Sequence, residues 1–112
     1  MSPDQRSYLH AEVIPAFAEG LDRLLVAIDQ PPVCWSTDRM KSMLKWAFRI
    51  DSTEAMTDAQ VADFITAVQA FAAECLIFIA TPLEWEQGIA ELEREKFYDY
   101  VLSSHDRLKE AA

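Results

Sequence analysis

The sequence is poor in glycine and cysteine, with two of each among 112 residues, and it contains no long apolar run. Its longest uninterrupted apolar run extends only from Cys75 to Ala80, far short of the roughly 20 residues that a membrane-spanning helix needs. The amino terminus lacks the basic-then-apolar pattern of a secretory signal, so we expect an intracellular protein in which Cys34 and Cys75 stay reduced. The scarcity of glycine and of strand-like alternation predicts an all-α fold.

Basic residues are scarce in the second half of the chain. Residues 1–50 carry six acidic and six basic residues, whereas residues 51–112 carry thirteen acidic and four basic ones, so the second half accounts for the net charge of −9. Nucleic-acid binding generally needs a net basic surface that displaces counterions from phosphates, and we therefore expect no direct nucleic-acid partner.

One basic feature stands apart, because Lys41, Lys45 and Arg49 recur every four residues and so share one face of a helix. We refer to these three residues as the basic stripe. It is interpreted either as a solvated helix face or as a surface that meets the acidic carboxy-terminal helix or an acidic partner.

Sequence patterns of catalysis and ligand binding are also missing. The chain has no Gly-rich phosphate loop, no nucleophile elbow and no paired-cysteine motif. Residues 51–62 resemble a calcium loop only loosely, because Met56 stands where glycine is needed and Ala62 where a bidentate glutamate belongs. His10 and His105 lack the glutamate three residues earlier that di-metal helical bundles use. We therefore predict a protein that is not an enzyme and has no catalytic residue, cofactor or metal ion.

Capping signals divide the chain into helices. Ser2, Thr57 and Thr81 each stand three residues before Gln or Glu, which is the pattern of a capping box, and Ser36 is a fourth N-cap candidate. The helices expected from these signals cover residues 2 to about 29, 37 to about 50, 57 to about 80, and 82 onward.

The apolar face of the last expected helix changes direction partway along. Residues on its first face are Trp85, Ile89 and Leu92, and residues on the nearly opposite face are Phe97, Val101 and Leu108. A straight helix with this pattern would touch two different surfaces. Either its second half packs on another chain or the helix is kinked.

The first expected helix is the most informative segment, because Pro15 and Gly20 interrupt it although its apolar residues keep helical spacing. Pro15 removes an amide donor and should kink or split the helix. Gly20 costs about 1 kcal/mol relative to alanine within a helix, so we expect another backbone to come close there. At about 100° per residue, one arc of roughly 120° contains Val13, Ile14, Phe17, Leu21, Leu24, Leu25 and Ile28. This pattern indicates a contact surface.

This segment resembles the dumpy-thirty (Dpy) motif, a family related to the dimerisation–docking domain of protein kinase A type II regulatory subunits. The matching positions are Tyr8, Leu9, Val13, Pro15, Gly20, Leu21 and Leu24, followed by Pro31 and Pro32. The resemblance covers about residues 5–32 well and residues 37–50 loosely, and it does not extend to residues 51–112. It implies two helices per chain that pair with a second copy as an antiparallel four-helix bundle. One groove of that bundle would receive an amphipathic helix of a partner protein.

The resemblance leads to a predicted function as a non-catalytic dimerisation and docking adaptor. Its partners would be a second copy of the chain and an amphipathic helix of another protein, within a ciliary or flagellar complex or a methyltransferase-type assembly. The cytoplasm and the cytoskeleton of the cilium are favoured over the nucleus by analogy with the family. The predicted protein-binding residues are Val13, Ile14, Phe17, Ala18, Leu21, Leu24, Leu25 and Ile28, of which Leu24 and Ile28 are expected nearer the core.

Two alternatives to the adaptor remain open at this stage, a structural subunit and a small-molecule carrier. Residues 1–50 are too few to bury enough surface unaided, so this dimerisation–docking-like hairpin must pack on a second copy or on an acidic helical hairpin at residues 57–112. In the latter case the chain would be a structural subunit whose own carboxy-terminal helices cover the apolar face of the motif. The third possibility is a small-molecule or lipid carrier, with apolar space around Trp35, Trp46, Phe71 and Phe78.

Overall fold

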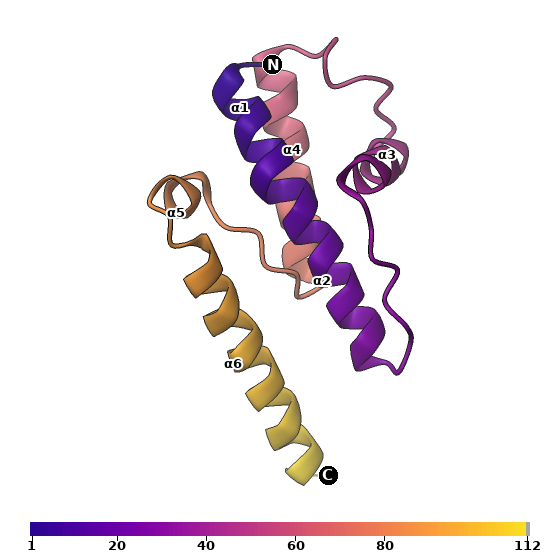
Figure 1. The fold of residues 1–112 in the computed structure, drawn as a ribbon, viewed down its shortest axis with the longest axis vertical. Helices are drawn as coiled ribbons and strands as arrows, with labels where there is room; N and C mark the ends of the chain where they lie inside the picture. The colour runs from indigo at the N-terminus through magenta and orange to yellow at the C-terminus, as the bar shows by residue number, and fades with distance from the viewer. Residues whose placement is uncertain (112) are drawn as a thin grey trace. The chain divides into compact units, whose positions relative to one another are not determined.

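Helices account for all the regular structure in the described part of the chain, which confirms the predicted all-α class (Figure 1). The computed structural model describes residues 1–111, except for the side chains of His105, Leu108, Lys109 and Ala111. The predictions that concern His105 and Leu108 therefore lie outside the described residues. The contacts divide the chain into two units, Met1–Ile79 and Ala80–Ala112.

The first long helix is built from three segments that follow one another directly. They are α1 (Pro3–Tyr8), the π-helical η1 (Leu9–Val13) and α2 (Ile14–Ala27). The Ser2 hydroxyl accepts a hydrogen bond from the Gln5 amide, and the Gln5 side chain accepts one from the Ser2 amide, as the capping box predicts. Pro15 lies in the first turn of α2 and has no amide to donate, and its ring crowds the carbonyl four residues earlier. A wider π turn before the proline accommodates both effects, so the predicted interruption takes this form.

Two further helices complete the first unit, namely α3 (Thr37–Ala47) and α4 (Asp58–Glu74). Both begin where predicted, because the side chains of Ser36 and Thr57 accept hydrogen bonds from the backbone of their first turns. The start of α4 lies beside α1, since Gln5 Nε2 donates to the Asp58 carbonyl over 2.7 Å. Farther along, the Phe17 ring stacks on the Phe71 ring with centroids 6.0 Å apart. α4 therefore runs parallel to the first long helix (Figure 1).

Several helices end in a Schellman motif, in which a residue in the left-handed conformation follows the cap. The left-handed residues are Asp29 (φ 61°), Arg49 (φ 58°), Leu76 (φ 59°) and Gly88 (φ 73°). After α4, the Ile77 amide donates to the Ala72 carbonyl over 2.8 Å, and the chain then leaves the helix. The expected helix over residues 57–80 is therefore too long, and its apolar last residues form an extended segment instead.

A carboxylate fixes the loop between α2 and α3. Asp22 Oδ1 accepts a hydrogen bond from the Val33 amide over 2.8 Å, and its Oδ2 accepts one from the Cys34 amide over 3.0 Å. Cys34 itself has a positive φ of 59°. Hydrogen bonds to an ionised acceptor are stronger than neutral ones, so Asp22 stabilises a turn whose positive φ at Cys34 is unfavourable for a residue other than glycine.

The core of the first unit draws on η1, α2, α3 and α4. The largest fully buried side chains there are Phe17, Leu9, Ile14, Met40, Leu44, Val13, Val61, Val68 and Thr53. Phe48 packs edge-on against Phe64 and Phe71, with centroids 5.8 Å and 6.4 Å away. Burying one such aliphatic or aromatic side chain contributes about 1.5–3 kcal/mol. The first fifty residues therefore obtain their core by packing on α4 of the same chain.

The second unit contains α5 (Pro82–Glu86) and α6 (Ala90–Ala111). The capping box at Thr81 forms as predicted, but the chain breaks after α5 at Gly88. Trp85 and Ile89 consequently lie outside α6. The expectation of one continuous last helix is wrong. Leu92 and Phe97 both lie within α6, however, so the change of face between them is not explained by the break.

Candidate protein-binding surfaces

The predicted binding residues separate into two groups at Gly20. The four residues before it are inaccessible in a single chain, with exposed fractions of 0% for Val13, 1% for Ile14, 1% for Phe17 and 8% for Ala18. Side chains of the same unit cover them, as the stacking of Phe17 on Phe71 illustrates. In the single chain, Ile14, Phe17 and Ala18 are therefore not accessible to a partner helix. Angular position on a helix tells which residues share a face, but it does not tell what covers that face.

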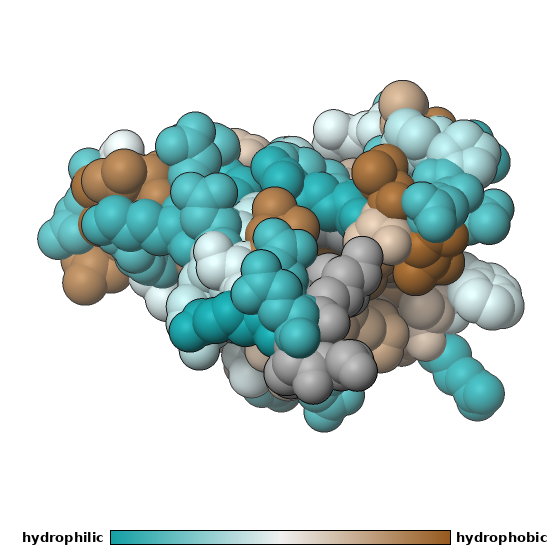
Figure 2. All heavy atoms as spheres, turned by 90° about the horizontal axis from the view of Figure 1, so that it is seen from below, coloured by the Kyte–Doolittle hydropathy of each residue, from teal (hydrophilic) through white to brown (hydrophobic). Residues whose placement is uncertain are grey.

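The residues after Gly20 are accessible. Leu21, Leu24 and Leu25 are half-buried, and Ile28 is 67% exposed, so Ile28 lies outside the core of the single chain. We refer to Leu21, Leu24, Leu25 and Ile28 as the distal α2 patch. Their spacing is i, i+3, i+4 and i+7, which places them on one stripe along the last two turns of α2. In the space-filling view, apolar residues reach the surface in several patches among hydrophilic ones (Figure 2).

Gly20 has a close neighbour, as its sequence position predicts, but the neighbour is a side chain. A Cβ atom built on Gly20 would lie 2.4 Å from Ile77 Cγ2 and 2.9 Å from Ile77 Cβ. Ile77 belongs to the extended segment after α4 and is itself buried. The predicted approach of another backbone is therefore replaced by the approach of a side chain from the same unit.

Tyr8 and Leu9 are also used within the chain. Tyr8 is buried, and its hydroxyl accepts a hydrogen bond from Gln69 Nε2 over 2.8 Å, while Leu9 is fully buried. Together with Val13, these positions contribute to the packing of the first long helix on α4. Much of the motif thus serves the internal core of this chain.

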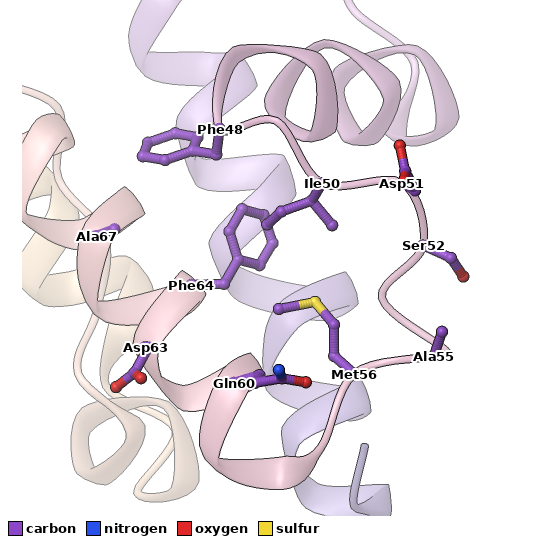
Figure 3. A pocket seen from close by; sticks show the side chains of 10 residues that line it. All are labelled: Phe48, Ile50, Asp51, Ser52, Ala55, Met56, Gln60, Asp63, Phe64 and Ala67. Carbon is purple, nitrogen blue, oxygen red and sulfur yellow. The ribbon is translucent and has the colours of Figure 1, made fainter.

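A pocket that the sequence did not reveal lies between the end of α3, the following loop and α4 (Figure 3). It is open, has a volume of about 480 Å³, and we refer to it as the apolar pocket. Its lining residues are Phe48, Ile50, Asp51, Ser52, Ala55, Met56, Gln60, Asp63, Phe64 and Ala67. Phe64, Ile50 and Met56 point toward one another across it, whereas the carboxylate of Asp63 points away from them.

The loop that carries Met56 is fastened to the rest of the unit. Arg6 Nη2 lies 2.6 Å from Glu54 Oε2, and Thr53 is only 2% exposed. An exposed ion pair contributes at most about 1 kcal/mol, so the buried Thr53 is the second restraint on a loop whose other side chains are exposed or half-buried. The apolar pocket is therefore part of the folded unit.

A second hollow adjoins the apolar pocket and shares Ile50 and Asp51 with it. We refer to it as the basic hollow; its volume is about 670 Å³. It is lined by Ser42, Lys45, Trp46, Ala47, Arg49, Ile50 and Asp51. Trp46 is 81% exposed, which is unusual for the largest apolar side chain. Of the four aromatic residues around which the sequence placed the apolar space of a carrier, Trp46 lines the basic hollow, whereas Trp35, Phe71 and Phe78 line neither hollow.

The described residues offer no group of three or more His, Cys, Asp or Glu side chains that could hold a metal ion. Over the same part of the chain, every helix is too short or too polar to cross a membrane.

Comparison with known proteins finds no match to this chain among protein-family models, curated proteins or solved structures. The resemblance to the Dpy motif therefore stays a prediction that depends on residues 5–32.

Proposed function

We propose that this chain is a non-catalytic adaptor that binds an amphipathic helix of another protein through the distal α2 patch. The observation that carries the proposal is the contrast at Gly20: the apolar residues before it are covered by the chain itself, and those after it remain accessible. A stripe at i, i+3, i+4 and i+7 is the surface that helix-in-groove recognition uses.

The charges beside the patch favour a partner with basic residues. On the same two turns, Arg23 forms an ion pair with Glu19 over 2.9 Å, and Asp22 is engaged by the loop amides. Asp29 follows the helix and is exposed. With acidic groups prevailing here and a net charge of −9 on each chain, a basic partner helix is attracted, whereas a second copy is repelled.

A second candidate is a structural subunit that docks no external helix. It is favoured by the burial of Val13, Ile14, Phe17 and Ala18, because these residues then serve folding alone. Dimerisation through the motif and placement in a ciliary or methyltransferase-type assembly rest on the resemblance alone, and the adaptor proposal does not require a second copy at the distal α2 patch.

The test selects helical peptides from a displayed library on the full chain and measures their affinity for variants. Ile28→Asp places a charge in the distal α2 patch and should weaken the selected helices at least tenfold. Val26→Asp is the matched control, because Val26 is 56% exposed on the same turns but lies off the stripe. Equal losses for both variants, or none for either, would contradict docking at the patch.

Light scattering of the full chain separates the remaining possibilities. A monomer that selects basic, patch-dependent helices supports the adaptor. A dimer that Ile28→Asp dissociates would show that a second copy occupies the patch. If the chain is a monomer and no helix that depends on the patch is selected on it, the structural subunit is supported instead.

A further inference from the structure

We propose that the apolar pocket and the basic hollow together form a second docking site, which takes an acidic peptide segment bearing one bulky apolar side chain. The two hollows meet at Ile50 and Asp51, so one extended ligand can reach both. This site lies on α3, α4 and the loop between them, and its existence does not depend on the distal α2 patch.

The apolar pocket provides the place for the bulky side chain. At about 480 Å³ it falls within the roughly 300–1,000 Å³ typical of ligand sites. Phe48, Ile50, Met56 and Phe64 give it an apolar interior. Methionine and phenylalanine walls adapt to different apolar side chains, which suits recognition of a leucine, methionine or phenylalanine anchor.

The basic hollow determines the charge of the ligand. Lys45 and Arg49 line it, and Lys41 lies one turn before Lys45 on α3. Arg49 lies beyond the end of α3, so the three residues do not share one helix face as the sequence predicted. None of the three forms an ion pair with the side chains that the structure describes. Free cations of this kind on a chain of net charge −9 form a local positive region. Screening limits electrostatic attraction to about 8 Å at physiological ionic strength, so the local charge decides what binds.

The acidic residues at the site limit where the ligand's carboxylates can lie. Asp51 lines both hollows, and Asp63 lies at the edge of the apolar pocket with its carboxylate directed away from the interior. The ligand's acidic groups should therefore follow the Lys45 and Arg49 side, with its apolar anchor toward Phe64.

Trp46 supplies the contact that would dominate the affinity. It is 81% exposed, and it lies in the sequence between a lysine and, three residues later, an arginine that line the same hollow. Tryptophan and arginine are the residue types most enriched among binding hot spots. The basic stripe, which the sequence left as either a solvated face or an acidic contact, is thereby assigned to the second of these roles.

The experiment uses a displayed library of random 16-residue peptides, selected on the full chain at physiological salt. We expect the enriched peptides to be net acidic and to share one bulky apolar position. Their affinity should fall at least tenfold with Trp46→Ala and with Ala67→Trp, because the latter fills the apolar pocket. Lys45→Glu combined with Arg49→Glu should cause a similar loss.

Matched variants control for folding and for net charge. Ala70→Trp adds the same side chain at an exposed position of α4 that does not line the pocket. Lys96→Glu combined with Arg107→Glu reverses two charges in the second unit, as many as the double variant in the basic hollow. Both should bind as the wild type does, and circular dichroism should show the same helical content in every variant.

Several results would overturn this site. They are enriched peptides without acidic residues, binding that is insensitive to Ala67→Trp, or no enrichment at all. Peptides that are lost with Ile28→Asp instead would argue against this site but support the distal α2 patch. A wild-type dimer that Ala67→Trp converts to a monomer would show that a second copy covers the pocket.

Discussion

The contact between Gly20 and Ile77 predicts that Gly20→Ala destabilises the wild-type chain but stabilises a chain in which Ile77 has been replaced by alanine. An alanine Cβ at position 20 would lie 2.4, 2.7 and 2.9 Å from Cγ2, Cγ1 and Cβ of Ile77. Carbon atoms prefer separations of about 3.5–4.0 Å, so Ile77 would have to retreat by roughly 1 Å. Rotating its side chain is not sufficient, because Cβ is itself too close. The backbone at Ile77 must then shift against the hydrogen bond of its amide to Ala72.

The magnitudes can be estimated from these constraints. Gly20→Ala gains about 1 kcal/mol of helix propensity, whereas overpacking a well-packed site costs about 1–3 kcal/mol. We expect a net loss of about 1 kcal/mol in the wild-type background. Ile77→Ala alone should cost about 2–5 kcal/mol, because Ile77 is only 2% exposed. Ile77→Ala removes Cγ1 and Cγ2 but keeps the Cβ at 2.9 Å, so a shift of about 0.5 Å is still needed, for which the space left by the larger side chain gives room. Gly20→Ala should then stabilise the Ile77→Ala chain by up to about 1 kcal/mol.

Urea unfolding followed by circular dichroism measures all four members of this cycle. A coupling energy of about 1–2 kcal/mol is expected, within the range found for residues in contact. Gly20→Leu should be more destabilising than Gly20→Ala, because the added bulk meets the same neighbour. If Gly20→Ala stabilised both backgrounds equally, the two residues would not be in contact, and the reasoning about this helix would be wrong.

Two further predictions concern a helix end and a loop. Arg49 is exposed and its backbone is in the left-handed conformation, so Arg49→Gly should raise the free energy of unfolding by about 0.5–1 kcal/mol. Arg49→Ala keeps the cost of the left-handed backbone and should change this free energy little. Equal effects of the two variants in urea unfolding would contradict this explanation. Asp22→Ala removes the acceptor of two loop amides and should cost about 1–2 kcal/mol, with faster hydrogen exchange at both amides. Asp22→Asn keeps one acceptor oxygen and should cost about half as much; exchange rates unchanged in both variants would show that the carboxylate does not hold the loop.

Where helices begin could be predicted from the sequence, but where they end could not. Ser2, Thr57 and Thr81 form capping boxes whose geometry is local, so three residues suffice to recognise them. The ends depend on left-handed residues, and at Arg49 and Leu76 these are not glycine, so no local signal marks them. Packing of the segments that follow offsets the cost of the left-handed backbone at these residues.

The candidate sites were predictable only in part. The sequence placed the apolar stripe of the first long helix correctly, but not the covering of its first half by α4, which depends on residues more than fifty positions away. The apolar pocket was missed because Phe48, Met56 and Phe64 come from three segments and share no periodicity. The basic stripe was the one signal near it, and its neighbour Trp46 gave no sign of being exposed.

The parallel arrangement of the first long helix and α4 also has a consequence for how the chain folds. Neighbouring helices in bundles are usually antiparallel and joined by short loops, which keeps contacts local and folding fast. Here the hydrogen bond between Gln5 and Asp58 spans 53 positions of sequence, and the Gly20–Ile77 contact spans a similar distance. Closing so long a loop costs conformational entropy, and this cost arises before the contacts can stabilise the chain. During synthesis, the first long helix therefore has to wait for residues up to Ile77, with its apolar stripe open to water until they emerge.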